Sequence, residues 1–239
     1  MCGRFTQQRP TAELAELFDA TPAPRGATGR VDDAGGHFNV APTQDVSVIV
    51  QPGSDRARVV DQYRWGLVPS WAKDVKIGNR LINARAETVA TSPAFRRSLV
   101  NKRCIVPADA FYEWRRVDDK TRQPYLIHHP DGSPLAFAGL WSAWKDEAND
   151  AWLHSCTIIT TAANEAMLAL HDRMPVVLPH DAWDRWLDPT VSDARLLQSF
   201  LHASAAGELE AYPVSTAVNS PRNKGAELAR PVAGPVLPA

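Results

Sequence analysis

The residues with the clearest chemical potential lie at the start of the chain, in the stretch MCGRF. Cys2 directly follows the initiator methionine and lies outside any apolar run, although cysteine is usually a core residue. Removal of Met1, which is common before a small residue, would leave an amine and a thiol on neighbouring carbons. Such a 1,2-aminothiol condenses with an aldehyde through its amine, and the thiol then adds to the imine carbon and closes a thiazolidine ring. The opening therefore predicts covalent capture of an aldehyde.

Several polar residues could assist this chemistry. Glu113 in AFYEWRR and His171 in ALHDRMPVVL could move protons during carbonyl addition, and Asn83 in LINARAET could orient the amine. Arg4 and Arg85 could hold an anionic substrate. Each residue also has a structural explanation: a helix cap for the histidine, a strand edge for the glutamate and a turn for the asparagine. Only their combination points to a site.

The remaining cysteines favour a structural interpretation. Cys104 and Cys156 lie in apolar β-type runs, where a reduced core thiol is expected. The cysteines and histidines lack the spacing of metal ligands, and no nucleotide-binding motif is found, so we expect neither a metal nor a cofactor.

Charge is unevenly distributed along a chain of 239 residues whose net charge is −1. From Lys73 to Arg103 there are eight basic and two acidic residues, which indicates either a phosphate-binding surface or a solvated face. The chain contains neither a membrane-spanning apolar run nor an export signal, so we expect a cytoplasmic protein.

The chain's periodicity predicts an α+β domain with a strongly bent, largely antiparallel sheet and peripheral helices, because strands and helices do not alternate regularly. A flexible loop is expected over residues 22–36 and an extended tail after Pro221. The expected strands span residues 46–51, 58–68, 103–114, 124–129, 135–144 and 155–161, and the expected helices span residues 11–18, 92–99, 161–170, 179–187 and 192–202.

Seven motifs give the chain a resemblance to a known family, and they extend from residue 1 to residue 228: MCGRF, NVAP, WGLVPSWA, INARAET, RCIVPADAFYEW, HDRMPVVL and VSTAVNSPRNKGAEL. In order and spacing they resemble the SRAP family, the SOS-response-associated peptidase domain. The resemblance implies one domain over residues 1–232 with a tail over 233–239. It also implies a DNA-damage protein that recognises abasic sites in single-stranded DNA. Such a protein forms a thiazolidine crosslink with the abasic sugar and shields the lesion.

The resemblance also assigns roles to individual residues. The catalytic residues would be Cys2, Asn83, Glu113 and His171. Cys2 would supply both nucleophiles, Asn83 would orient the amine or the sugar, and the other two would transfer protons. The DNA-binding residues would be Arg4, Pro42, Trp71, Arg85, Trp114 and Thr160. We expect a monomer, associated with the nucleoid when bound to DNA.

Two other classes of function remain open at this point. Cys2 could be the N-terminal nucleophile of a true peptidase or amidase, with Met1 removed autocatalytically. Alternatively, the protein could read modified single-stranded DNA without forming a bond, and Cys2 would then only line the pocket.

Four of the eight tryptophans are expected to serve packing, namely Trp141, Trp144, Trp183 and Trp186.

Overall fold

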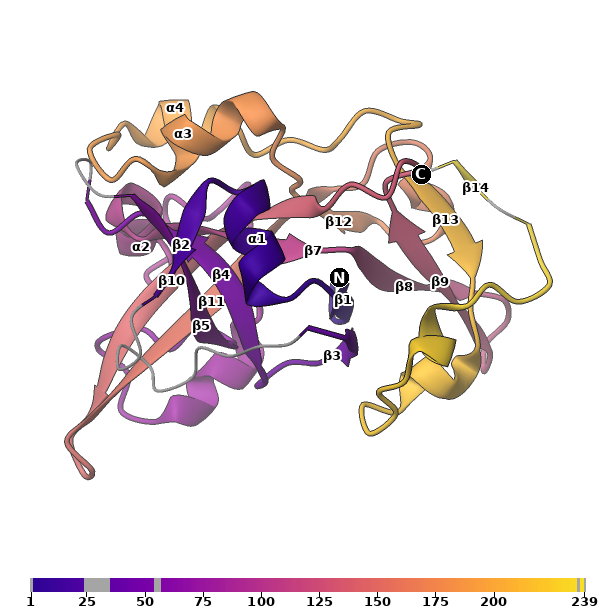
Figure 1. Cartoon of the computed structure of the whole chain (residues 1–239), viewed down its shortest axis with the longest axis horizontal. Coiled ribbons are helices and arrows are strands. Elements are labelled where there is room, and N and C mark those ends of the chain that lie inside the picture. Colours follow the sequence, from indigo (N-terminus) through magenta and orange to yellow (C-terminus); the bar gives the residue numbers. More distant parts are fainter. Residues whose placement is uncertain (1, 24–34, 54–56, 236, 239) are drawn as a thin grey trace.

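The computed structural model describes residues 2–23, 35–53, 57–235 and 237–238, and its elements are shown in Figure 1. The strands are β1 (Phe5–Gln7), β2 (Ala20–Pro22), β3 (His37–Val40), β4 (Asp45–Val50), β5 (Arg58–Trp65), β6 (Asn83–Arg85), β7 (Arg103–Ala108), β8 (Ala110–Arg116), β9 (Arg122–His128), β10 (Leu135–Asp146), β11 (Ala151–Ala162), β12 (Arg173–Pro175), β13 (Glu210–Pro213) and β14 (Leu237–Pro238). The α-helices are α1 (Thr11–Leu17), α2 (Arg96–Asn101), α3 (Trp183–Leu187) and α4 (Ala194–Ser199). The 3-10 helices are η1 (Val75–Arg80), η2 (Met167–Ala169), η3 (His180–Ala182), η4 (Thr216–Asn219) and η5 (Ala226–Ala229).

A small closed barrel forms one half of the fold. Strands β11, β10, β7, β4 and β5 are neighbours in that order, and β11 returns to pair in parallel with β5 through Cys156 and Trp65. All the other pairings around the ring are antiparallel. Apolar residues at alternating positions face the interior, as expected for a barrel this small. The α+β class and the bent, largely antiparallel sheet predicted from the sequence are therefore confirmed.

The second half is a sheet in the order β14, β13, β9, β8, β1 and β3. The short N-terminal strand β1 lies inside this sheet, where Phe5 is opposite Val40 on one side and Phe111 on the other. The Phe5 ring also packs edge-on against Trp65 of the barrel, with a centroid distance of 5.0 Å. The strand that follows Cys2 is thus held by both halves of the fold.

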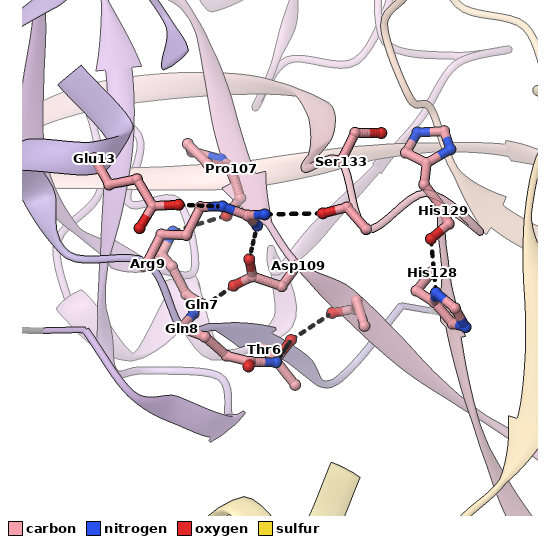
Figure 2. A network of polar contacts seen from close by, with 12 residues as sticks. Thr6, Gln7, Gln8, Arg9, Glu13, Pro107, Asp109, His128, His129 and Ser133 are labelled. Atoms are coloured by element: carbon pink, nitrogen blue, oxygen red, sulfur yellow. Dashed lines mark hydrogen bonds and ion pairs between the residues drawn. The ribbon is translucent and has the colours of Figure 1, made fainter. Parts of the chain in front are cut away.

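A polar network fixes the end of β1, as Figure 2 shows. The Asp109 carboxylate accepts hydrogen bonds from the Gln8 backbone N–H and the Arg9 guanidinium. Arg9 also donates to Glu13 Oε1 at 2.8 Å in α1 and to the Gly132 carbonyl at 2.8 Å in the β9–β10 turn. Because Asp109 and Arg9 are both largely buried, their charged hydrogen bonds are less screened than those of a surface pair.

The helices cover the outside of the barrel with a second apolar cluster. In Figure 1, α3 and α4 lie together on one side of the molecule, near α1 and α2. Phe18 after α1 stacks on Trp183 of α3 with a centroid distance of 4.5 Å, and Trp186 is fully buried. Cys104 and Cys156 are buried free thiols, as predicted. Trp183 and Trp186 also serve packing as expected, Trp141 is half-buried and packs against the other core cluster, and Trp144 is half-buried.

The helix predicted over residues 161–170 is wrong. Strand β11 continues to Ala162, because Thr160 and Thr161 pair with β12, and β-branched residues suit a strand. Only η2 follows, and its first N–H, from Met167, donates to Asn164 Oδ1 at 2.8 Å. The helix expected over 92–99 is shifted to α2, whereas those expected over 179–187 and 192–202 are present as η3 with α3 and as the shorter α4.

The C-terminal segment packs against the six-stranded sheet. The segment contains η4 and η5, and Leu237–Pro238 pairs with β13 at the sheet edge. Most of the loop expected over residues 22–36 lies outside the described residues, and the domain boundary near residue 232 remains a prediction. No helix in the described ranges is both long and apolar enough to cross a membrane.

Candidate functional site at the N-terminal cysteine

Cys2 lies in the apolar cluster between the two halves of the fold and is fully buried. It precedes β1, which is positioned by the Tyr112 N–H donating to the Arg4 carbonyl at 2.9 Å. Burial raises the pKa of its thiol, and the nearby Glu113 carboxyl raises it further. The thiol is therefore protonated at neutral pH, and its addition to a carbon requires a proton acceptor.

Asn83 directly contacts Cys2. Its Nδ2 donates to the Cys2 carbonyl at 2.8 Å, and because a carbonyl only accepts, the amide orientation is fixed. Its Oδ1 is buried with no hydrogen-bond partner among the described residues. A buried acceptor without a partner is costly, so it indicates a place where a donor is expected. The side chain is held by β6, whose Asn83 and Arg85 pair in parallel with Ile158 and Thr160 of β11.

Glu113 extends from β8 toward the same cluster and is 4% exposed. Burial raises the pKa of its carboxyl, and the charge of His171 offsets part of that effect. The backbone N–H of Trp114 donates to Glu113 Oε1 at 3.3 Å. A carboxyl with a raised pKa holds its proton closer to neutral pH, as a proton donor in catalysis must.

His171 lies after η2, and its imidazole is 30% exposed. The Arg173 N–H lies 3.0 Å from His171 Nδ1, and the Asp172 carboxylate oxygen lies 2.7 Å from the same nitrogen. Nδ1 accepts from the Arg173 N–H when that nitrogen carries no proton, and it donates to the Asp172 carboxylate when it carries one, so both tautomers of the ring have a partner.

Arg4 has structural partners in addition to its predicted DNA role. Its guanidinium donates to Asn39 Oδ1 at 2.9 Å, to the Val218 carbonyl at 2.9 Å and to the Asn219 carbonyl at 3.3 Å. Burial lowers its pKa. Asn39 is fully buried, and its Nδ2 donates to three carbonyls of residues 218, 220 and 223. These two residues attach the η4 segment to the N-terminal strand.

Arg85 and Thr160 lie side by side at the end of β6. Arg85 is exposed, and its side chain makes no hydrogen bond or ion pair within the described ranges. Thr160 is 1% exposed, and its carbonyl accepts from Arg173 at 2.6 Å. Arg173 also forms a double ion pair with Glu87, at 2.5 and 3.0 Å, which lowers the pKa of that carboxyl. The pair connects the segment after Asn83 to the strand after His171.

The remaining predicted DNA contacts lie on three separate segments of the chain. Trp71 is 55% exposed in the loop after β5, and Pro42 is half-buried in the β3–β4 turn. Trp114 is half-buried, and its Nε1 donates to Asn219 Oδ1 at 2.7 Å. Because Trp114 follows Glu113 on a strand, the two side chains extend to opposite faces of β8.

Sequence reasoning did not assign the residues that hold this arrangement together. Glu87 lies two residues after Arg85, and Arg173 lies two residues after His171, inside motifs already noted. Lys224 donates to the Asn39 carbonyl at 2.7 Å and lies in the motif near the C-terminus. Opposite charges in two separate motifs are a signal for such pairing, although the sequence does not say which ones meet.

The basic segment from Lys73 to Arg103 is not one continuous surface. Arg103 is buried, its Nε donates to the Trp186 carbonyl at 2.5 Å, and burial lowers its pKa to about 10. The Lys102 ammonium lies 4.9 Å from the centre of the Trp141 ring. Arg85 and several other members are exposed. Among the described residues, no three His, Cys, Asp or Glu side chains are grouped to hold a metal ion.

Comparison with known proteins places this arrangement in a family. The family model described as SOS response associated peptidase (SRAP) matches residues 1–221. The chain is 47% identical to "Abasic site processing protein YoaM" of Bacillus subtilis (strain 168), over 95% of this chain and 97% of that protein. It is 33% identical to "Abasic site processing protein YedK" of Escherichia coli (strain K12), over 97% and 100%. A crystal structure of a protein from Bacteroides thetaiotaomicron has the same fold, with a TM-score of 0.83, 23% identity and coverage of 97% and 100%. The chain belongs to the SRAP family.

Proposed function

We propose that this protein is a sensor of abasic sites in single-stranded DNA that bonds covalently to the abasic sugar through Cys2 after removal of Met1. The observation that carries the proposal is the position of Asn83 and Glu113, an orienting amide and a proton carrier, beside the buried Cys2. The full-length likeness to proteins called abasic site processing proteins supports the same interpretation.

The amine of Cys2 begins the reaction. Its nitrogen adds to the aldehyde carbon of the ring-opened sugar and forms a carbinolamine. Asn83 holds the Cys2 carbonyl at 2.8 Å, and its unpaired Oδ1 is an acceptor for an N–H of the new amine. One side chain thus fixes the direction of the amine lone pair, which favours attack through proximity and orientation.

Glu113 carries the proton through the next two steps. Its carboxyl, whose pKa is raised by burial, gives a proton to the carbinolamine hydroxyl, which leaves as water. The resulting iminium carbon accepts the Cys2 sulfur, and the thiol proton goes to the Glu113 carboxylate. A carbon–sulfur bond closes the thiazolidine, one water is released in total, and Glu113 regains its starting state. His171, which interacts electrostatically with Glu113, assists proton exchange with solvent.

The DNA strand would lie over the exposed side of this site. Arg85 is available for a phosphate, and Trp71 offers an exposed ring on which a base can stack. Arg4 would contact DNA only while keeping its three protein partners, so its main contribution is to hold the η4 segment. A bound strand and a closed ring would together shield the lesion.

The test is a denaturing gel of protein incubated with a single-stranded oligonucleotide that carries one abasic site. We expect a stable shifted band for the wild type and none for Cys2→Ser, whose hydroxyl replaces the thiol. Intact mass should equal protein without Met1 plus DNA minus one water. The absence of a shift above an undamaged oligonucleotide would reject the proposal.

The family description also contains the word peptidase, so the same protein should be incubated with a peptide panel. Multiple-turnover cleavage that depends on Cys2, without any DNA crosslink, would favour an N-terminal-nucleophile hydrolase instead.

A further inference from the structure

The β8–β9 hairpin has two chemically different faces. Glu113 extends toward Cys2, whereas the next residue, Trp114, extends toward the opposite face, as alternation along a strand requires. On that second face Trp114 is paired with Pro124, and Arg116 is paired with Arg122. Trp114 is an expected DNA contact, and this end of the hairpin has no part in the proposed covalent chemistry.

A groove of about 370 Å³ lies at this place and is lined by Trp114, Lys120, Arg122 and Asn219. The lining comes from β8, the hairpin turn, β9 and the end of η4. Lys120 and Arg122 are exposed, and neither side chain has a hydrogen bond or ion pair with any other described residue.

The local charges leave this groove positive. Arg116 and Arg122 are directly opposite each other, an arrangement of like charges that destabilises a strand pair. Asp119 forms an ion pair with Arg116, and the Asp118 carboxylate accepts the backbone N–H groups of Lys120 and Thr121, each at 2.8 Å. Asp118 keeps its negative charge, but residues 116–122 carry three basic and two acidic side chains, so the turn is positive and an anion in the groove would relieve the repulsion.

The aromatic wall has a fixed orientation. The Trp114 Nε1 donates to Asn219 Oδ1 at 2.7 Å, and the ring packs against the cluster that contains Tyr112 and Val218. A half-buried indole held by a hydrogen bond loses little side-chain entropy when a planar group stacks on it.

We propose that Lys120 and Arg122 extend the DNA contact already expected at Trp114, so that this groove binds one nucleotide of the damaged strand with its phosphate at the two basic side chains and its base on the indole. A phosphodiester and a base supply the anion and the ring that the groove lacks. The identity of the strand rests on the proposed function, whereas the affinity of the groove for single-stranded DNA is independent of crosslinking.

The direct test measures noncovalent binding of an undamaged, fluorescently labelled 15-mer of dT to the full chain at several salt concentrations. The double variant Lys120→Gln/Arg122→Gln should bind roughly tenfold more weakly, and the slope of log K against log salt should fall by about 0.7 for each phosphate that the protein no longer neutralises. Arg195→Gln, which removes an exposed charge on α4, is the matched control and should behave as the wild type. Unchanged affinity in the double variant, or equal weakening in the control, would overturn the proposal.

Stacking is tested by a second pair of variants. Trp114→Leu should weaken binding at least fivefold with an unchanged salt slope, because the variant keeps every charge, and Trp114→Phe should recover most of the affinity. Equal DNA affinities of Trp114→Leu and Trp114→Phe would contradict stacking of a base on Trp114.

The crosslinking assay separates this proposal from the proposed function. The double variant should crosslink a 15-mer more slowly at limiting DNA, but should match the wild type on an abasic nucleotide with a single phosphate on each side. Equal slowing of crosslinking on both substrates would contradict DNA binding by the groove. If the wild type forms no crosslink but the double variant still binds dT more weakly than the wild type, the proposed function fails and the groove stands.

Discussion

The N-terminal site and the barrel interior both hold buried thiols, and the two places differ in what surrounds the sulfur. Cys2, Cys104 and Cys156 are all fully buried, and burial raises the pKa of each thiol. Only Cys2 also lies beside a carboxyl, that of Glu113. For Cys104 the electrostatic neighbour is another thiol, that of Cys156, which also raises the pKa of Cys104. Burial therefore does not distinguish the proposed nucleophile, Cys2, from the packing thiols in this protein, whereas the nearby Glu113 carboxyl does.

The largest effect should follow from removal of that carboxyl. We expect Glu113→Gln to slow crosslinking roughly 10²–10⁴-fold, the range of general acid–base catalysis, because glutamine neither donates nor regains the proton. Time courses on denaturing gels measure the rate. Asp61→Asn is the matched control, since Asp61 is a buried carboxyl on barrel strand β5 that interacts electrostatically with Tyr63. An equally low crosslinking rate in Asp61→Asn would show that loss of any buried carboxyl slows the reaction, and it would contradict a specific role for Glu113.

A change at a barrel thiol should affect stability and leave the chemistry intact. Cys156→Ser places a hydroxyl in the apolar cluster without a designed partner, which should lower the free energy of unfolding by about 1–3 kcal/mol. Chemical denaturation gives this value, and the crosslinking rate of the folded variant should match the wild type. Loss of crosslinking in a stably folded Cys156→Ser would contradict the assignment of Cys156 to packing.

Asn83→Ala should have a smaller effect on rate than Glu113→Gln. It removes the hydrogen bond to the Cys2 carbonyl and the free Oδ1, and the loss of one hydrogen bond of about 1.4 kcal/mol slows a reaction about tenfold. Asn149→Ala, at the tip of the β10–β11 hairpin, removes an exposed amide that only contacts Asp146 and should leave the rate unchanged. An unaltered crosslinking rate in Asn83→Ala would contradict the proposed role of the Asn83 amide in orienting the Cys2 amine.

The smallest effect is a pH dependence of stability. Burial raises the pKa of Glu113 in the folded chain, so the folded state retains a proton that the unfolded chain loses near about pH 4.3. The stability due to this carboxyl is present below that pH and is lost as the pH rises through the folded pKa. Glutamine does not titrate, so the stability of Glu113→Gln relative to the wild type should increase with pH across this window. Urea denaturation at several pH values checks the sign, and a constant or falling difference would contradict it.

Much of the sheet could be predicted from the sequence because its strands carry strong local signals. The runs that became β4, β5, β7 to β11 are rich in β-branched and aromatic residues, and turn residues separate them. Helix prediction was weaker because the helices are short. The stretch after Thr160 has apolar residues that suit either state, and pairing with β12 decides for a strand. The closure of β11 onto β5 depends on long-range pairing that no local pattern shows.

The site was predictable in composition but not in its connections. Cys2, Asn83 and Glu113 were expected to act together, and the structure brings them together. The sequence did not show that Asn39 and Arg4 would attach η4 to the N-terminal strand, because these contacts join residues about 180 to 215 positions apart. Nor did it separate Trp114 from Glu113, although alternation along a strand implies opposite faces.

The position of β1 inside its sheet has a consequence for the order of events during synthesis. This strand pairs with β3 and with β8, and Arg4 is held by carbonyls of η4. The first residues to be translated therefore reach their final positions only after the η4 segment, near the end of the chain, has been synthesised. The surroundings of Cys2 are therefore complete only when nearly the whole chain has been synthesised, and a chain that ended before η4 would lack the carbonyls that hold Arg4.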